Sequence, residues 1–348
     1  MLTLNLLKFA GSLKSPPWLL LLASLMTACG DSHVKGPTVN YPDFEWTPSN
    51  EPTEVVSVGP ISALPKANVN GVTYNTAAAN VTLNGTTGVF TDLKIGHIVT
   101  IDGRLNQGRA TGNADHIEFK ANVLGPIEHI DTWLQRIVVM GQSVLFDSNT
   151  TFDHGIDPIS LVGLNLGSVA RISGFTTAGG EIVATRIEPA PSNSGFQVIG
   201  AVSGLDLGNF TFQINGLVVD YSSAVIIDLP GGMPADAMKV AVRGSLATDG
   251  RFVVEQISDI APGANIAVGI HMEISGYISS YQSDTNFQVS GFPVTTDFHT
   301  TFYSGMRDDL SLGAKVEIHG QRTSSGAIVA DQIGFGSLPT FLTFDFKD

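Results

Sequence analysis

LGAKVEIHG, at residues 312–320, decides the fold, because nearly the same nine residues occur three more times upstream. The copies are IGHIVTIDG (95–103), LGSVARISG (166–174) and DAMKVAVRG (236–244). In the last copy Val316 and Ile318 alternate with polar residues, which is the period-2 pattern of a half-buried β-strand. We call this segment the anchor strand, and its four copies predict an array of all-β units.

The repeat spacing sets the size of each unit. The anchor strands close on Gly103, Gly174, Gly244 and Gly320, which stand 71, 70 and 76 residues apart. That spacing exceeds the 20 to 45 residues of solenoid repeats, so each unit is predicted to be a small domain. Five strands are expected in each: a glycine-containing strand, a second glycine-bearing strand, a threonine-rich strand, the anchor strand and a last strand. The last strands end at Ile117, Ile187, Ile257 and Ile333.

The anchor strands also predict a division between core and surface. Ile101, Ile172 and Val242 take the place of Ile318 and are expected to face the core. The loop residues Ile95, Leu166 and Leu312 are expected to plug that core, with Met233 or Met238 in the third copy. The glycines at both ends are expected to adopt positive φ. The face that bears Glu317 and His319 varies between copies, so we expect it to face solvent and to carry any binding specificity.

Composition and charge exclude one class of partner. Of the 348 residues 43% are hydrophobic and 14% are charged, which is ample apolar material for several small cores. Removing residues 1–28, which contain Lys8 and Lys14 and no acid, leaves 16 basic against 32 acidic residues, a formal charge of −16. Nucleic acid is therefore not an expected partner, because binding to phosphate depends on Lys and Arg.

The N-terminus predicts where in the cell the protein is located. Residues 1–28 have the basic start and short apolar run of a signal peptide, and the run WLLLLASLM (18–26) is too short to span a bilayer. LMTACG around Cys29 resembles the lipobox of bacterial lipoproteins, which implies lipidation of Cys29; an ordinary cleaved signal with a chance cysteine is the alternative. Residues 29–54 are predicted to be a flexible tether. We expect an outer-membrane lipoprotein that faces the periplasm or the cell surface.

The whole repeat resembles a known family. The succession of a GxI strand, an FxVxG hairpin, a threonine-rich strand, LxxGxxVxIxG and AxxI is similar to the bacterial domain of unknown function 5666, found in tandem in secreted proteins and lipoproteins. The resemblance implies small all-β modules and no catalytic residue. The shared five-strand plan also resembles an OB-type barrel. We place the modules at residues 55–121, 122–191, 195–262 and 270–338, followed by a tail at 339–348.

Motifs that specify a reaction are not found in the sequence. It contains no GxSxG, P-loop or dinucleotide fingerprint, and its eight histidines have no zinc-site spacing. Asp147, Asp153 and Asp157 lack the spacing of a calcium loop. Asp153 and Asp157 are expected to cap a turn, and Asp308 and Asp309 to begin a helix or turn. No catalytic, cofactor-binding or metal-binding residue is predicted, and no cofactor.

Two functions remain open. The first is a lipid-anchored, non-enzymatic envelope protein whose modules form a spacer or binding scaffold for an envelope protein or a glycan. Its expected face is the aromatic-rich fourth repeat, through Tyr277, Tyr281, Phe292 and Tyr303. The alternative is a periplasmic enzyme or accessory subunit that acts on polysaccharide or peptide. It requires two buried carboxylates that face each other between repeats.

Overall fold

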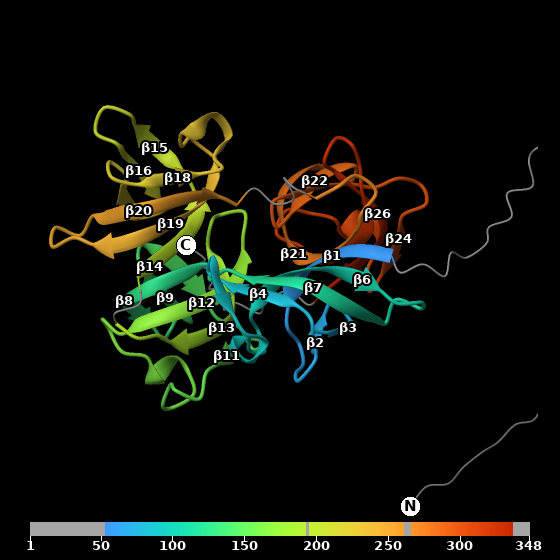
Figure 1. Ribbon diagram of the computed structural model, residues 1–348, viewed down its shortest axis with the longest axis horizontal. Coiled ribbons are helices and arrows are strands. Elements are labelled where there is room, and N and C mark those ends of the chain that lie inside the picture. Colours follow the sequence, from blue (N-terminus) through green and yellow to red (C-terminus); the bar gives the residue numbers. More distant parts are fainter. Residues whose placement is uncertain (1–52, 193–194, 261–265, 337–348) are drawn as a thin grey trace, which may run out of the picture. The chain divides into compact units, whose positions relative to one another are not determined.

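The computed structural model describes residues 53–192, 195–260 and 266–336, and in this part of the chain the protein is all-β (Figure 1). The described residues contain twenty-six strands and four single 3₁₀ turns. No helix within them has the length and apolar character that a membrane crossing requires. The strands pair in four groups, which we call barrels 1 to 4.

The strands have the following bounds. Barrel 1 contains β1 (Thr53–Pro60), β2 (Ala67–Val69), β3 (Val72–Asn75), β4 (Asn80–Leu83), β5 (Thr86–Gly88), η1 (Phe90–Asp92), β6 (Ile98–Leu105) and β7 (Thr111–Phe119). Barrel 2 contains β8 (Val123–Asp131), β9 (Arg136–Val139), β10 (Gln142–Leu145), β11 (Thr151–Phe152), η2 (Leu161–Gly163), β12 (Val169–Thr176) and β13 (Ile182–Pro189). Barrel 3 contains β14 (Phe196–Ala201), β15 (Ser203–Asp206), β16 (Thr211–Ile214), β17 (Leu217–Asp220), β18 (Val225–Ile227), η3 (Pro230–Gly232), β19 (Lys239–Leu246) and β20 (Phe252–Asp259). Barrel 4 contains β21 (His271–Ser283), β22 (Asn286–Val289), β23 (Phe292–Thr295), β24 (Thr301–Tyr303), η4 (Arg307–Asp309), β25 (Lys315–Arg322) and β26 (Ile328–Phe335).

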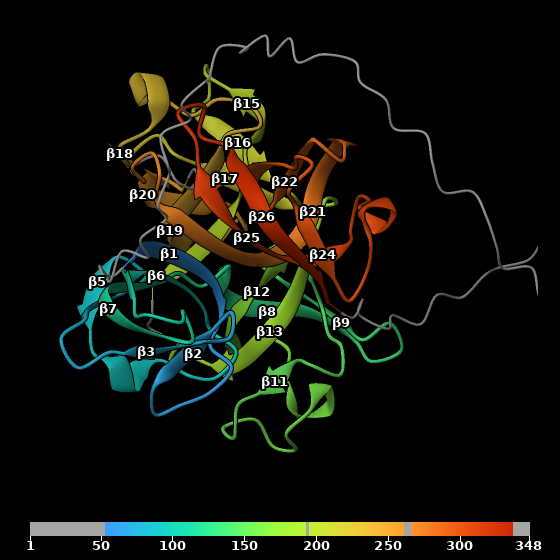
Figure 2. The ribbon, with the colours of Figure 1, turned by 90° about the vertical axis from the view of Figure 1, so that its right-hand side faces the viewer.

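Barrel 2 shows the topology most simply. Its strands close a ring in the order β8, β9, β10, β13, β12 and back to β8. Every neighbouring pair is antiparallel except β10 and β13, which run parallel. Barrel 4 repeats this ring with β21, β22, β23, β26 and β25, and Figure 2 shows these strands side by side. The predicted five-stranded, OB-like barrel is therefore confirmed.

The identity of the five strands differs from the prediction. The segment predicted as a single second strand is a complete hairpin, as in β9 and β10, which turn at Met140 and Gly141 with positive φ. The threonine-rich strand lies outside the ring. In barrel 2 this strand is β11, which pairs in parallel only with the last strand, β13.

Barrel 1 does not close in the same way. Its ladder runs β2, β3, β7, β6, β1, and β1 has no hydrogen-bonded ladder to β2. The sequence before Asn70 is shorter here than in the other repeats, so the first hairpin strand, at Ala67–Val69, has three residues instead of four. The free side of β1 pairs instead with β21 of barrel 4, in parallel, from Val55 opposite His271 to Val58 opposite Ile274.

The order of the barrels in space therefore differs from their order in the chain. Barrels 1 and 4 share one thirteen-stranded sheet through β1 and β21, and barrels 2 and 3 share another through β8 and β14 (Figure 1). Barrels 2 and 3, which are neighbours in sequence, have one continuous apolar core.

The anchor strands place their aliphatic residues as predicted. Ile318 and its three equivalents are buried, as is the isoleucine that ends each last strand. The prediction that loop residues fill the core was wrong for three copies. Ile95, Leu166 and Leu312 are 43, 66 and 59% exposed. In the third copy Met238 packs against the core, whereas Met233 is exposed.

The glycines at the two ends of each anchor strand have different roles. Gly313, before the strand, has φ of 82°, as predicted. Gly320, at the other end, does not have positive φ; it lies at a β-bulge against the last strand. A Cβ at Gly320 would stand 2.2 Å from the Val329 carbonyl oxygen. Close approach of two backbones, not left-handed conformation, therefore requires glycine there.

This geometry predicts the effect of a single methyl group. Gly320→Ala should lower the free energy of unfolding by about 1–3 kcal/mol, because the added Cβ forces β25 away from β26. Urea unfolding of the variant beside Ser325→Ala, which changes an exposed turn residue, would measure it. Equal losses in the two variants would contradict this role of the glycine.

Candidate functional site

A large cleft lies where strands of all four barrels converge. It has a volume of about 1500 Å³. Asp102 and Glu118 line it from barrel 1, Phe175 from barrel 2, Lys239 from barrel 3 and Phe292 from barrel 4. We call this the central cleft. It exists only because the barrels are held together, so no single repeat contains it.

The central cleft is richer in acidic than in basic side chains. Six carboxylates and three lysine or arginine side chains line it. Two of these cations are already paired, because Arg104 lies 3.0 Å from Asp115 and Lys120 lies 2.9 Å from Glu118. Burial raises the pKa of Asp102, the nearby His116 opposes that shift, and the negative charges of Glu118 and Asp115 add to it. A cationic ligand would relieve this repulsion.

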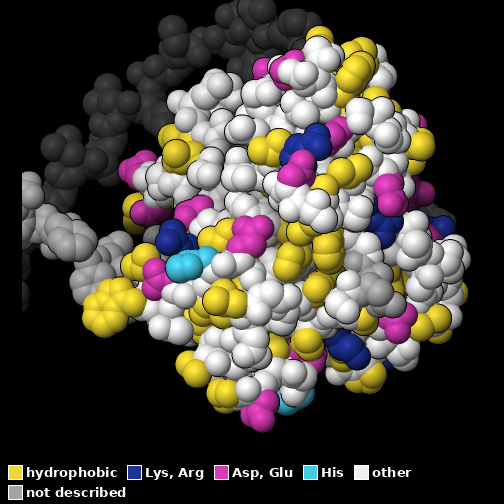
Figure 3. All heavy atoms as spheres, turned by 90° about the vertical axis from the view of Figure 1, so that its left-hand side faces the viewer, with side chains coloured by type: hydrophobic (Ala, Val, Ile, Leu, Met, Phe, Trp, Pro, Cys, Tyr) yellow, Lys and Arg dark blue, Asp and Glu magenta, His cyan; other side chains and the backbone are white. Residues whose placement is uncertain are grey.

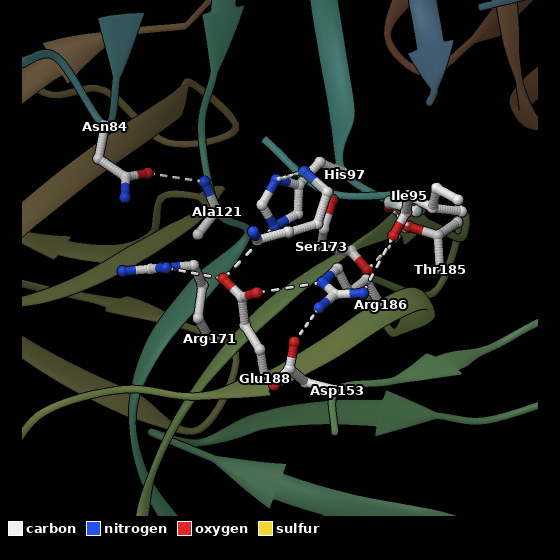
Figure 4. Close-up of polar contacts among 12 residues, drawn as sticks. Asn84, Ile95, His97, Ala121, Asp153, Arg171, Ser173, Thr185, Arg186 and Glu188 are labelled. Atoms are coloured by element: carbon white, nitrogen blue, oxygen red, sulfur yellow. Dashed lines mark hydrogen bonds and ion pairs between the residues drawn. The ribbon is translucent and has the colours of Figure 1, made fainter. Parts of the chain in front are cut away.

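A buried ionic cluster joins barrels 1 and 2 (Figure 4). Glu188 of β13 accepts from Arg171 Nη1 at 2.7 Å and from Arg186 Nε at 3.0 Å. Arg186 also donates to Asp153 and, across the joint, to the Ile95 carbonyl oxygen of barrel 1. The cluster satisfies each buried charge with a partner, which is the condition for burying ions without a large penalty.

His97 of barrel 1 completes this cluster. It is 1% exposed and stacks on Phe119 with the ring centroids 4.0 Å apart. The Lys94 amide donates to Nδ1, so Nε2 carries the proton of the neutral ring and faces Glu188 Oε1 at 3.4 Å. Burial lowers the pKa of His97, which keeps the ring neutral. Burial alone would raise the pKa of Glu188, but His97 and Arg171 outweigh it and lower the pKa to about 2.

A second polar cluster lies where barrel 4 meets barrel 1. His271 and Glu273 project from β21, and His319 projects from the facing position of β25. Glu273 Oε1 lies 3.7 Å from both His271 Nε2 and His319 Nδ1. Tyr74 of barrel 1 donates to Glu273 Oε2 at 3.4 Å. Among the described residues this is the group of side chains with the composition and spacing to hold a metal ion.

Charge is concentrated in this second cluster. Burial opposes ionisation of Glu273, but His271 and His319 outweigh burial and lower the pKa of Glu273 to about 2. Burial likewise opposes protonation of His319, but Glu273 and Glu317 outweigh it and raise its pKa to about 9. These residues have no zinc-type spacing along the chain, since Glu273 and His319 meet only through the pairing of β21 with β25. The sequence does contain one indication of this cluster: His271 and Glu273 are two residues apart, which places both on the same face of a strand.

The variable face of the anchor strands was expected to face solvent, and this was wrong. Ser173 is 1% exposed and accepts the Ile98 amide of barrel 1 at 2.8 Å. Asp102, at the same position of barrel 1, lines the central cleft. His319 belongs to the second cluster, and Arg243 reaches Gly85 of barrel 1, where a Cβ would stand 3.6 Å from its Nη1. Two of these positions, Ser173 and Arg243, meet barrel 1, whereas His319 contacts residues of its own barrel.

The predicted aromatic face is only half exposed. Tyr277 and Phe292 are 2 and 6% exposed, and Tyr277 packs edge-on against Phe175 of barrel 2. Tyr281 and Tyr303 remain near the surface, at 37 and 38%. The aromatic residues of barrel 4 therefore form part of a joint and do not form one binding surface.

The other predicted residues lie as follows. Asp153 caps a turn by accepting the Gly155 amide, and Asp309 accepts the Met306 amide at η4, as expected. Asp153 also pairs with Arg186, and Asp147 accepts the Asn149 amide. Cys29, the predicted lipidation site, lies outside the described residues.

The arrangement that the enzyme alternative requires is not found among the described residues. Glu188 and Glu273 are the two buried carboxylates there, and they belong to different clusters. Each has a lowered pKa; a general acid in glycoside hydrolysis needs a raised one, which Asp102 of the central cleft has. Charges of both signs are scattered singly over the face in Figure 3, without a basic patch on that face.

Comparison with known proteins agrees with the resemblance read from the sequence. Two segments, residues 125–188 and 275–334, match the family model described as "Domain of unknown function (DUF5666)". They coincide with most of barrels 2 and 4. No curated protein matches the chain. Among solved structures, the chain is similar to "drosophila Unr CSD456", with 12% identity over 63% of this chain and 98% of that one and a TM-score of 0.16. Because this TM-score is low, the similarity does not itself support the fold, and the barrel topology follows from the strand pairing.

The ionic cluster predicts a defined dependence of stability on pH. The folded pKa of Glu188, about 2, is below its ordinary value of 4.5. Its contribution, about 3 kcal/mol at 1.36 kcal/mol per pKa unit, is therefore complete above pH 4.5 and is lost as the pH falls toward 2.

Glu188→Gln should thus destabilise the protein at about pH 7 and much less at about pH 3, measured by urea unfolding at both. The matched control is Glu255→Gln, which changes an exposed carboxylate. A loss for Glu188→Gln that is the same at both pH values would show that the lowered pKa does not stabilise the fold.

Proposed function

We propose that this protein is a lipid-anchored cell-envelope protein whose barrels form a non-catalytic binding scaffold, and that the central cleft holds an extended, positively charged polypeptide segment. The observation that carries the proposal is the cleft itself, lined by side chains of all four barrels. A ligand in the cleft would contact all four repeats at once, so binding would require all four modules.

The size of the central cleft supports a polymeric ligand. Small-molecule sites have volumes of about 300–1,000 Å³. The cleft, at about 1500 Å³, is larger. A segment of several residues would use that space, and the mixture of apolar and hydrogen-bonding side chains along the walls suits a polypeptide.

The charge of the cleft supports a basic segment. Burial is the main cause of the raised pKa of Asp102, and the negative charges of Glu118 and Asp115 add to it. Lysine or arginine side chains of a ligand would favour the ionised form of Asp102. The formal charge of −14 for the whole chain would also speed the approach of a cationic partner.

The lipobox-like N-terminus supports the location. Acyl chains contribute about 0.8 kcal/mol per buried CH₂, so two or three of them hold a protein on a membrane durably. The tether predicted at residues 29–54 would then let the barrels reach partners at a distance from the bilayer.

Charge removal in the cleft tests the proposed ligand class. Fluorescence anisotropy would measure the affinity of a labelled decapeptide of alternating lysine and serine for the protein. The double variant Asp102→Asn/Glu118→Gln should raise its Kd about five- to tenfold, as expected for about 0.5–0.7 kcal/mol for each of the two charge contacts.

Two controls make this test specific. Asp308→Asn/Asp331→Asn removes two charges from exposed positions of barrel 4 and should leave the Kd unchanged. A decapeptide of glutamate and serine should not bind. Equal weakening by both double variants would mean that net charge alone attracts the peptide, and the cleft would lose its assigned role.

The anchor has its own test. Cells that express the protein and are fed labelled palmitate should incorporate the label into it, and Cys29→Ala should abolish incorporation and release the protein from the membrane fraction. Label retained by Cys29→Ala would contradict lipidation at this residue.

A further inference from the structure

His271, Glu273 and His319 bring three metal-ligating atoms to one point. His271 Nε2 and His319 Nδ1 each lie 3.7 Å from Glu273 Oε1, and the three ligand atoms are all within 4.8 Å of one another. The side chains of His271 and Glu273 are 3 and 2% exposed, and that of His319 is 20% exposed. The group is therefore buried on the side of β21 and reachable from the side of β25.

The spacing fits a bound ion better than direct hydrogen bonds. Separations of 3.7 Å exceed the usual range of about 2.7–3.2 Å for N–H···O bonds. Ligands about 2.0–2.1 Å from a tetrahedral zinc ion lie about 3.3 Å apart, so these ligand atoms, now within 4.8 Å of one another, would move inward to complete the coordination.

Neighbouring groups hold two of the three side chains in positions suited to binding an ion. His319 Nε2, the nitrogen that would not bind the ion, lies 2.8 Å from Glu317 Oε1. Metal-binding histidines commonly donate their second N–H to a carboxylate in this way, which fixes the ring and makes the ligand more basic. Glu273 Oε2, the oxygen left over, is held by the Tyr74 hydroxyl.

We propose that His271 Nε2, Glu273 Oε1 and His319 Nδ1 bind a divalent transition-metal ion of the Zn²⁺ class, which is a property separate from ligand binding in the central cleft. Two imidazoles and one carboxylate suit Zn²⁺, whereas Ca²⁺ and Mg²⁺ take oxygen ligands. Three protein ligands leave a fourth position for water or another donor on the exposed side of His319. Such an ion would tie β21 to β25 beside the joint with barrel 1.

Calorimetric titration of the full-length protein tests the site. Zn²⁺ should bind with a stoichiometry of one per chain, and Mg²⁺ should not bind. His319→Gln should weaken Zn²⁺ binding at least tenfold. The matched control is His299→Gln, which removes a histidine with a 73% exposed side chain and should leave binding unchanged.

A second variant keeps the three ligands in place. Glu317→Gln removes only the carboxylate behind His319 and should weaken Zn²⁺ binding about 10- to 100-fold. Co²⁺ substitution should give the visible absorption of a four- or five-coordinate ion, and His319→Gln should remove it. The proposal would be overturned if the unaltered protein did not bind Zn²⁺, or if His299→Gln weakened Zn²⁺ binding as much as His319→Gln does.

Discussion

The parallel pairing of β1 with β21 is the contact on which the arrangement of the barrels depends. It joins the first described strand to the first strand of the last repeat, and its side chains add to the backbone ladder. Asn70 donates to the Glu273 carbonyl oxygen, 203 residues further along the chain, and accepts from Ser275. The edge of β1 opposite β6 carries this ladder, as the N-terminal part of β8 carries the ladder between barrels 2 and 3. The convergence of all four barrels on one cleft follows from this closure.

Local features of the fold could be predicted from the sequence, and contacts between repeats could not. Alternation along the anchor strand identified Val316 and Ile318 as core residues, because a strand with one buried face must alternate. The two-residue alternation does not predict which repeats pack against each other, since contacts such as the pairing of Val55 with His271 join distant segments. The role of Gly320 was misread for a similar reason: a glycine required by a close backbone looks the same in sequence as one required by positive φ.

The same distinction explains the candidate sites. Residues that vary between repeats were expected to face solvent, because in an isolated module the face opposite the core does so. Here Ser173 faces barrel 1, His319 belongs to a cluster that Tyr74 of barrel 1 also contacts, and the buried charges gather at the joints. A repeat whose core is constant and whose outer face is adapted to each neighbour can form one asymmetric body from similar units. Polar chemistry is found at the joints because only there do residues of different repeats meet in partly dry surroundings.

The open edge of barrel 1 also sets an order of events in time. A ladder between β1 and β21 cannot form until more than 200 residues of intervening chain have emerged, whereas barrels 2 and 3 need only residues near one another. Contacts between distant segments are the slow ones, because the chain must first lose the entropy of a long loop. We therefore expect the ladder between β1 and β21 to be among the last contacts to form, although β1 is made first. During that interval the exposed edge of β1 is the part of the chain most in need of protection from pairing with another molecule.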